Sequence, residues 1–204
     1  PDPNYEPDGR YFKKLIGFFD NVETTTDREL IRALIMTPMA GLQWDKRPAF
    51  AITAGERNCG KSTLAEAVGD LYGGHIELRL GRDPEKDIFQ RLLAPSNLYK
   101  RVARIDNVKG LCSSTELEAI LTSKVINGHR IHKGDASRPN NLTFIFTGNA
   151  LTLSTDLTRR TFTINMTKPM ESEDWEGEMK QFIIANRKRI FADIIAELRR
   201  PVPK

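Results

Sequence analysis

Gly55-Glu56-Arg57-Asn58-Cys59-Gly60-Lys61-Ser62 is the stretch that decides the fold of this chain. It fits the pattern G-x-x-x-x-G-K-[ST] of the phosphate-binding P-loop, whose glycines let backbone N–H groups point at phosphate oxygens. An apolar stretch at 50–54 precedes it, and a helical stretch at 63–68 follows it. The motif needs this context, because the N-terminus of the helix adds partial positive charge at the same place. The sequence therefore predicts nucleotide binding.

The residues of this loop have separate expected roles. Lys61 is expected to reach the β- and γ-phosphates of ATP, and the Ser62 hydroxyl is expected to bind Mg²⁺. A carboxylate near the magnesium is also required, usually at the end of a neighbouring strand. Asp106 ends the extended run 101–106 and is the candidate for that second magnesium ligand. The predicted nucleotide contacts are Gly55, Glu56, Arg57, Asn58, Cys59, Gly60, Lys61, Ser62 and Thr63.

Asn107 follows Asp106 at the position that decides how water is activated. Many ATPases carry a glutamate here, which polarises the attacking water. An amide can orient a water molecule but cannot accept its proton. Either hydrolysis is slow, or a base comes from elsewhere. Glu116 and Glu118, on the helix that is expected to follow, are candidates for that base.

Two further polar positions follow along the chain. The apolar stretch 142–147 ends in Gly148-Asn149, and the pair Arg159-Arg160 comes just before the apolar stretch 161–166. A guanidinium that reaches a phosphate stabilises the charge on a transferring phosphoryl group. Taken alone, however, this arginine pair is better explained as two surface residues.

The order of these four positions resembles an AAA+ ATPase. More narrowly, it resembles the superfamily-three and related replicative helicases of viruses, phages and mobile genetic elements, including the C-terminal domain of poxvirus-type primase-helicases. The resemblance covers residues 50–166 and implies that Asn149 contacts water or the γ-phosphate, as a catalytic residue beside Lys61, Asp106 and Asn107. Arg160 follows Asn149 by 11 residues. This spacing is similar to that of papillomavirus- and polyomavirus-type helicases. It implies that Arg160 is an arginine finger, with Arg159 as the alternative.

The resemblance also implies a nucleic-acid contact within segment 124–138. Asn127-Gly128 and Lys133-Gly134 are turn signals with short apolar residues between them, so a β-hairpin is expected. In the resembled helicases such a hairpin carries a Lys-His pair that grips the nucleic-acid backbone. His132-Lys133 stands in the matching place in reversed order, and basic side chains contact phosphates without reading sequence. The predicted nucleic-acid contacts are His129, Arg130, His132 and Lys133.

Strand and helix stretches alternate along the chain, which favours a parallel sheet covered by helices on both faces. The predicted fold class is α/β, a three-layer α/β/α P-loop NTPase of the AAA+ type. Its mainly parallel sheet has five strands, and helices flank it at the N-terminal and C-terminal ends. Strands are expected at 50–54, 75–80, 99–105, 142–147 and 161–166, and helices at 61–71, 84–93, 114–123 and 172–199, the last with Ser172 as N-cap.

The N-terminal part of the chain is expected to be helical as well. Helices are predicted at 10–20 and 27–36, with Thr26 as the N-cap of the second and Pro38 as its stop. The predicted domains are an N-terminal tail and helical element at 1–45, the ATPase core at 46–168 and a C-terminal helical segment at 169–204.

The composition of the 204 residues is that of a globular protein, with 39% hydrophobic and 28% charged residues and a net charge of +4. No apolar run reaches the roughly 18 residues of a membrane span, and no signal peptide is visible. Two cysteines suggest no disulfide framework, so a cytoplasmic location is expected. The cell is expected to be bacterial or phage-infected. If the source is a eukaryotic virus, the expected location is a host replication compartment. The chain begins without methionine and is expected to be a domain of a longer polypeptide.

With the P-loop, the resemblance implies an ATP-driven nucleic-acid translocase or helicase domain that assembles into a homo-oligomeric ring, expected to be a hexamer. ATP and Mg²⁺ are the expected cofactors, and single-stranded DNA, or RNA, is the expected partner. Hydrolysis of ATP to ADP and phosphate would occur between subunits. Two other interpretations stay open. One is a non-motor AAA+ switch or loader, to which Asn107 gives weight, and the other, less favoured, is a P-loop small-molecule kinase.

Overall fold

A five-stranded parallel sheet forms the centre of the molecule. The structure is a computed structural model that describes residues 5–40, 47–79, 84–130, 134–168 and 174–200. The strands follow the order β2-β3-β7-β1-β9, and each neighbouring pair is parallel. Their bounds are β1 (Ala49–Ala54), β2 (His75–Leu78), β3 (Val102–Ile105), β7 (Thr143–Asn149) and β9 (Thr161–Asn165). The predicted five-stranded sheet is therefore confirmed.

Both faces of this sheet are buried, as expected when helices cover a parallel sheet on two sides. Along β1, Phe50, Ile52 and Ala54 belong to one apolar cluster, while Ala49 and Ala51 belong to the other. The alternation follows from the period of two in a strand, which sends successive side chains to opposite faces. The strand therefore reads as one continuous apolar run in the sequence although it supplies two separate cores.

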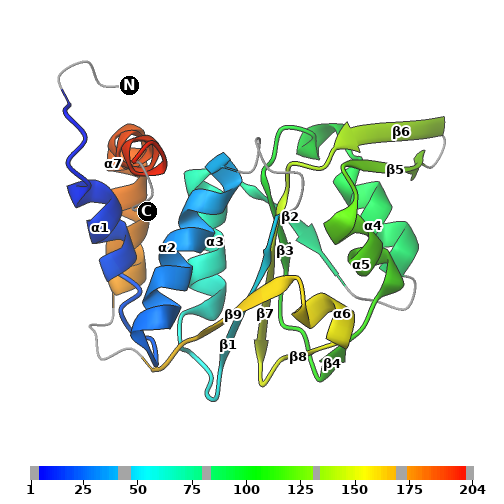
Figure 1. Ribbon diagram of the computed structural model, residues 1–204, viewed down its shortest axis with the longest axis horizontal. Coiled ribbons are helices and arrows are strands. Elements are labelled where there is room, and N and C mark those ends of the chain that lie inside the picture. The colour runs from blue at the N-terminus through cyan, green and yellow to red at the C-terminus, as the bar shows by residue number, and fades with distance from the viewer. Residues whose placement is uncertain (1–4, 41–46, 80–83, 131–133, 169–173, 201–204) are drawn as a thin grey trace.

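Helices cover the two faces in unequal depth (Figure 1). On one face lie α2 (Thr25–Ala40) and α3 (Lys61–Leu71), with α1 (Arg10–Gly17) and α7 (Trp175–Leu198) outside them. On the other face lie α4 (Pro84–Leu92), α5 (Thr115–Thr122) and α6 (Thr155–Thr158). The smaller elements are the 3₁₀ turn η1 (Pro95–Asn97), the pair β4 (Leu111–Cys112) and β8 (Thr152–Leu153), and the hairpin β5 (Val125–Arg130) and β6 (Gly134–Pro139).

The chain's N-terminal segment is fastened to α7 by one buried carboxylate. Asp193 is 1% exposed, and its two oxygens accept hydrogen bonds from the Tyr5 hydroxyl at 2.6 Å and the Tyr11 backbone N–H at 2.9 Å. The backbone N–H groups of Gly9 and Phe12 donate to it at 3.1 Å. Because the first turn of a helix leaves its N–H groups unpaired, Asp193 caps α1 from a distant part of the sequence.

Helix α2 corrects two predictions about its ends. Thr24, not Thr26, caps it: the Thr24 hydroxyl accepts from the Asp27 N–H at 3.1 Å, and Asp27 accepts from the Thr24 N–H at the same distance. The two groups satisfy each other, which moves the helix start to Thr25. Pro38 does not stop the helix and lies inside its last turn. A proline this near the end removes a single donor, so two more residues can follow.

The hairpin and the strand before Asp106 also differ from their predictions. Asn127-Gly128 is not a turn but lies within β5, where a Cβ on Gly128 would come within 2.9 Å of Cδ1 of Leu93. The glycine lets β5 pack closely on Leu93 and Phe89 and does not form a turn. The strand predicted from residue 99 begins at Val102, because the carbonyls of Leu98 and Lys100 accept from the Arg138 guanidinium. The predicted cap Ser172 lies outside the described residues.

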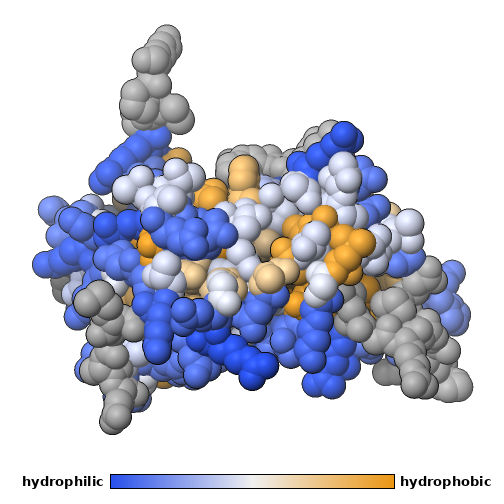
Figure 2. Space-filling view, turned by 90° about the horizontal axis from the view of Figure 1, so that it is seen from below, coloured by the Kyte–Doolittle hydropathy of each residue, from blue (hydrophilic) through white to orange (hydrophobic). Residues whose placement is uncertain are grey.

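The face at the carboxyl ends of the strands is mixed in character. Figure 2 views the molecule from below, toward these strand ends, and polar residues cover most of the surface. Apolar residues gather in the right half of that view, near β4 and β8. Leu111 of β4 is 65% exposed. Among the described residues, none of the helices is both long and apolar enough for a membrane crossing.

Candidate functional site

The P-loop lies where β1 ends and α3 begins. Gly60 has φ 78° and directly precedes the helix, and Asn58 has φ 59°. Both values lie in the left-handed region, which glycine and asparagine tolerate better than most residues. The loop therefore turns tightly and brings the unpaired N–H groups of the α3 N-terminus to its inner side. Lys61, the first residue of α3, donates from Nζ to the Glu56 carbonyl at 3.0 Å.

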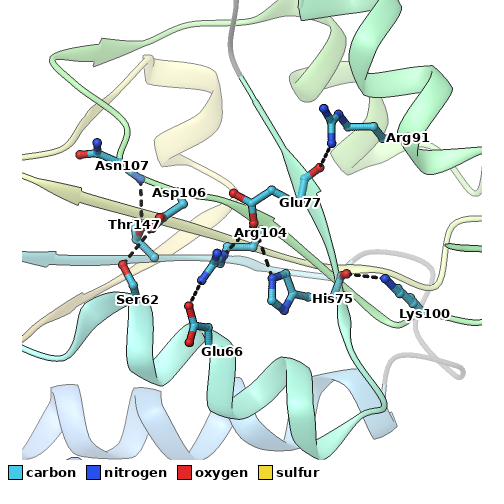
Figure 3. A network of polar contacts seen from close by, with 10 residues as sticks. All are labelled: Ser62, Glu66, His75, Glu77, Arg91, Lys100, Arg104, Asp106, Asn107 and Thr147. Carbon is cyan, nitrogen blue, oxygen red and sulfur yellow. Dashed lines mark hydrogen bonds and ion pairs between the residues drawn. The ribbon is translucent and has the colours of Figure 1, made fainter. Parts of the chain in front are cut away.

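Ser62 and Asp106 lie together, as the sequence predicts for a magnesium site. The Ser62 hydroxyl donates to Oδ1 of Asp106 at 2.9 Å, and the Thr147 hydroxyl donates to the same oxygen (Figure 3). The topology explains the meeting: β7 lies between β1 and β3, so the three carboxyl ends are adjacent. A carboxylate beside a hydroxyl at the end of a P-loop suits a hard divalent cation.

Asp106 keeps its charge in this setting. Burial alone would raise the pKa of its carboxyl, but hydrogen bonds from Thr147 and Ser62 oppose burial. The positive charge of Arg104 and the backbone N–H of Asn107 act in the same direction, and the net result is a lowered pKa. The carboxylate is therefore ionised at neutral pH and available to a metal ion.

Asn107 and Asn149 border the same pocket. Its volume is about 650 Å³, and its lining includes Lys61, Ser62, Asp106 and Thr147 as well as these two amides. Asn107 takes φ 54°, and its N–H donates to the Thr147 hydroxyl at 3.2 Å. The positive φ turns the chain sharply away from β3 at the strand end.

Gly148 explains how Asn149 reaches the pocket. A Cβ at this position would lie 2.5 Å from the Val108 carbonyl oxygen, a distance that no larger residue could accept without moving the backbone. The end of β7 therefore packs directly on the chain that leaves Asp106. This close approach places Asn149 and Asn107 in the same wall of the pocket.

Arg104 forms a charged cluster behind Asp106. Its Nη1 lies 2.8 Å from Oε1 of Glu66 on α3, and its Nε lies 3.0 Å from Oε2 of Glu77 on β2 (Figure 3). Arg104 precedes Asp106 by two residues, so both side chains project from the same face of the chain. The two carboxylates balance the guanidinium and hold it where its charge lowers the pKa of Asp106.

Arg159 and Arg160 lie at the other end of the sheet. The Arg160 carbonyl accepts from the N–H of Ala49, the first residue of β1, at 2.9 Å. The six residues of β1 separate this point from the P-loop by roughly 20 Å. Nη1 of Arg160 donates to the Asp156 carbonyl at 2.8 Å, and Arg159 is exposed. The structure therefore does not bring either arginine to the P-loop of the same chain.

The predicted nucleic-acid contacts are only partly described. His132 and Lys133 lie outside the described residues, and Arg130 is placed only as the last residue of β5. His129 is 70% exposed in its side chain, and its Nδ1 lies 3.1 Å from Oδ1 of Asp135 across the hairpin. The predicted hairpin itself is confirmed, with antiparallel pairing from Val125 to Arg130 against 134–139.

The two candidate bases do not line the site. Neither Glu116 nor Glu118 is among the described residues of the pocket that holds Asp106. Oε1 of Glu118 accepts from the Ser154 hydroxyl at 2.6 Å. The Glu116 carboxylate accepts from the hydroxyls of Ser114 and Thr115 at 2.7 and 2.9 Å. Both glutamates take part in local contacts around α5.

Two residues of the site have no assigned role in the sequence prediction. Thr147 orients Asp106 and is 1% exposed, and Trp175 lies against the P-loop glycine Gly60. A polar residue at the end of the apolar run 142–147 was the available signal for Thr147. Trp175 gave no such signal, because it comes more than 100 residues after the loop and fits the apolar side of α7.

The fold is shared with solved structures of the NrS-1 C-terminal region and of JCV helicase. The apo A form of the NrS-1 C-terminal region matches with a TM-score of 0.60 at 20% identity, covering 95% of this chain and 46% of that one. A structure of the helicase of JCV with a bound acetamide compound matches with a TM-score of 0.58 at 16% identity, covering 94% and 62%. The X-ray structure of JCV helicase matches at 0.52 and 14%, covering 95% and 62%. No protein-family model matches the chain. No curated protein sequence matches it either.

At these identities the likeness shows the fold alone. The predicted α/β fold is thus confirmed, and it is the fold that this chain shares with the NrS-1 C-terminal region and the JCV helicase structures. It spans 46% of the NrS-1 chain and 62% of the JCV helicase chains. What the longer proteins do therefore bears on this chain only as a proposal.

Proposed function

We propose that this chain is the ATPase domain of a ring-forming nucleic-acid helicase or translocase, which hydrolyses ATP to ADP and phosphate with Mg²⁺. The observation that carries the proposal is the hydrogen bond between Ser62 and Asp106, which joins the P-loop to the end of β3. A chance match to the P-loop pattern would have no reason to meet an ionised carboxylate there. The helicase-like fold supports the choice of a motor among P-loop proteins.

In this mechanism the loop residues from Gly55 to Thr63 bind the phosphates through backbone N–H groups. Lys61 exchanges the Glu56 carbonyl for the β- and γ-phosphate oxygens. Ser62 and Asp106 would hold the Mg²⁺, which would neutralise charge on those oxygens when bound. Asn149 orients the attacking water or the γ-phosphate. Asn107 borders the same pocket, but its amide cannot accept the proton of the water.

Arg160 is proposed to act on the nucleotide of a neighbouring subunit. Arg160 lies at the opposite end of β1 from the P-loop of its own chain. It could therefore stabilise charge on a γ-phosphate only in trans, at the P-loop of another subunit. Arg159, next to it and exposed, is the alternative. Such an arrangement requires a closed ring, which we propose to be a hexamer. The exposed Leu111 offers apolar surface close to the site for that assembly.

The hairpin of β5 and β6 is proposed to contact single-stranded DNA, or RNA, in the ring channel. His132 and Lys133 are the expected backbone contacts, with Arg130 and His129 beside them. These side chains would bind phosphates without sequence preference. The division into 1–45, 46–168 and 169–204, and the cytoplasmic location, also stay predictions.

Asn107 favours a second candidate function. With an amide where a base is expected, and with Glu116 and Glu118 outside the pocket, the chain could bind ATP tightly and turn it over slowly. A non-motor switch or loader would have that property. A small-molecule kinase is less favoured, because the basic segment comes before the Asn149 strand rather than as a lid over the site.

The test is steady-state ATP hydrolysis with and without single-stranded DNA over a series of protein concentrations, with Lys61→Ala as control. A motor is expected to show turnover that rises with DNA and with concentration and is lost in the variant. Flat, near-zero turnover despite measurable ATP binding would contradict the motor and support the switch. Turnover that requires a small-molecule acceptor would support the kinase.

A further inference from the structure

A second pocket lies on the other side of the P-loop. Its volume is about 340 Å³, within the size range of ligand pockets, and it is lined by 58–63, Trp175 and Glu176. Asn58, Lys61 and Ser62 also line the pocket that holds Asp106. One loop therefore forms a wall of both pockets.

The strand order fixes which side each pocket occupies. In the sheet, β1 has β7 and then β3 on one side, and β9 on the other. Asp106 and Asn149 come from the β3 and β7 side. Met166, directly after β9, donates its N–H to the Thr53 carbonyl of β1 and places its Cε 3.6 Å from a Cβ built on Gly60. Trp175 comes at the start of α7 and approaches Gly60 from this second side.

Trp175 lies directly against the loop. Its Cη2 would be 3.2 Å from a Cβ on Gly60, so the ring occupies the space beside the glycine. The ring packs edge-on against Phe19, with centroids 5.8 Å apart, and the residue remains partly exposed. An aromatic ring supported on one side and open to a pocket on the other is suited to stacking.

The neighbouring Glu176 holds this ring in place. Its Oε1 accepts from the Thr63 hydroxyl at 2.8 Å, although the two residues are 113 positions apart in the sequence. The bond joins the first turn of α7 to the first turn of α3. Trp175 is therefore fixed relative to the loop and does not depend on its own contacts alone.

The magnesium side of the loop determines the direction of a bound nucleotide. Lys61 and the Ser62–Asp106 pair serve the β- and γ-phosphates, so the terminal phosphates lie on the β3 and β7 side. The α-phosphate and the nucleoside must then leave the loop on the opposite side. That side holds Gly60, Thr63 and Trp175.

We propose that Trp175 stacks on the base of the bound nucleoside triphosphate and contributes to its affinity. The inference rests on the proposed function, since it needs a nucleotide in the P-loop. The ligand is a nucleotide with an aromatic base, and stacking on the ring does not by itself select among bases, because every base has a π-face. Trp175 thus adds a base contact to a loop whose other contacts serve phosphates.

The experiment compares ATP with inorganic tripolyphosphate, which keeps the phosphate chain and lacks the base. Affinities for both are measured by calorimetry with Mg²⁺ for the unsubstituted chain, Trp175→Ala, Trp175→Leu and Trp175→Phe. The Ala and Leu variants are expected to weaken ATP roughly tenfold, the loss of one stacked aromatic contact, and to leave tripolyphosphate unchanged. Trp175→Phe is expected to restore most of the ATP affinity. Ile184→Ala, an exposed position on α7, is the matched control and should change neither ligand.

Fluorescence gives a second readout of direct contact. In a Trp44→Phe background Trp175 is the only tryptophan in the sequence, and ATP but not tripolyphosphate should change its emission. The Leu variant keeps apolar volume at the position but lacks an aromatic ring. Its thermal melting curve is compared with that of the unsubstituted chain, and an unchanged curve means that weaker ATP binding reflects lost stacking and not a folding defect.

Three results would overturn the inference. The first is an ATP affinity that is the same in Trp175→Ala as in the unsubstituted chain, and this result does not contradict the proposed function. The second is an equal loss for ATP and tripolyphosphate, which would mean that the ring only supports the loop. The third is failure of both ligands to bind the unsubstituted chain, and this result alone overturns the proposed function as well.

Discussion

The two ends of the central sheet differ in how complete they are within one chain. At the carboxyl ends of the strands, Ser62 of α3 and Thr147 of β7 are already joined by hydrogen bonds to Asp106, which follows β3. At the amino ends, the Arg160 guanidinium donates to the carbonyl of Asp156 in its own turn, and Arg159 is exposed. The first end contains the connected polar groups that we propose to bind metal and phosphate, whereas the second carries charge without a target in the described part of the chain.

In the proposed ring, this difference marks the end of the sheet at which a partner subunit would be needed. Groups that must meet within one subunit are brought together by strand order, since neighbouring parallel strands end at the same edge. Groups that act between subunits have no such constraint and lie on the surface. A ring would place the amino end of one subunit against the carboxyl end of the next, and the predictions below test that division.

The largest effect is expected from Arg160→Ala. If the amino end serves a neighbour's site, hydrolysis by the assembled protein should fall on the order of 10³-fold while ATP binding stays unchanged. Mixing this variant with Lys61→Ala should restore part of the activity. Some interfaces in the mixture combine the intact P-loop of an Arg160→Ala subunit with the intact Arg160 of a Lys61→Ala subunit. Phosphate release and nucleotide affinity are the two measurements.

Arg159→Ala is the matched control for Arg160, and it should retain most of the activity. The reverse result, with Arg159 essential and Arg160 dispensable, would assign the finger to the alternative residue. Loss of ATP binding in Arg160→Ala, or no recovery in mixtures, would contradict action in trans.

A smaller effect is expected from Thr147→Val at the carboxyl end. The substitution keeps the shape of a buried residue but removes the hydroxyl that donates to Asp106 and accepts from the Asn107 N–H. Groups that orient a metal ligand typically change metal affinity by about 10- to 100-fold when removed, so the Mg²⁺ dependence of hydrolysis should shift by that amount.

Thr143→Val is the control on the same strand. Thr143 is also buried, and the described residues give its hydroxyl no hydrogen-bond partner. It should leave the Mg²⁺ dependence unchanged. Equal effects of the two variants would mean that Thr147 acts through strand packing and not through Asp106.

The smallest effect concerns the pH dependence of stability. The pKa of Asp106 is lowered in the folded chain, so its ionised form contributes stability above the ordinary value of 3.8, and this contribution is lost as pH falls through the folded pKa. Because the carboxylate is partly exposed, the contribution should stay below about 1 kcal/mol. Urea unfolding is measured for the unsubstituted chain and for Asp106→Asn, without nucleotide or Mg²⁺. The difference between their free energies of unfolding should be smaller at pH 3 than at pH 6. A difference that grows on acidification would contradict the stabilisation of the folded chain by ionised Asp106.

The sequence predicted the strand, loop and helix around Gly55 to Ser62 well, because their signals are local. The pattern from Gly55 to Ser62 carries its own backbone requirement, and the strand and helix beside it follow from apolar runs at the right lengths. Asp106 could be found because it ends such a run. The hairpin was found from its turn signals, but the turn at Asn127-Gly128 was wrong, since both residues lie within β5, where Gly128 packs close to α4.

Residues whose role depends on distant neighbours could not be assigned in this way. Arg104 looks like any charge in a short strand until α3 and β2 bring Glu66 and Glu77 to it. Asp193 looks like a surface acid of α7 until the N-terminus of α1 reaches it. A helical pattern shows which face is apolar, but it does not show what lies opposite a polar side chain.

The sequence by itself determined that this chain has the P-loop pattern at the end of a strand, followed by an acid, an amide and an arginine pair. Periodicity and turn chemistry encode such features within a few residues, so they survive without knowledge of the fold. Only the tertiary structure decided that β7 separates β1 from β3, that Thr147 orients Asp106 and that Trp175 meets Gly60. These contacts join residues far apart in the chain, and their partners are chosen by the packing of layers rather than by any local pattern.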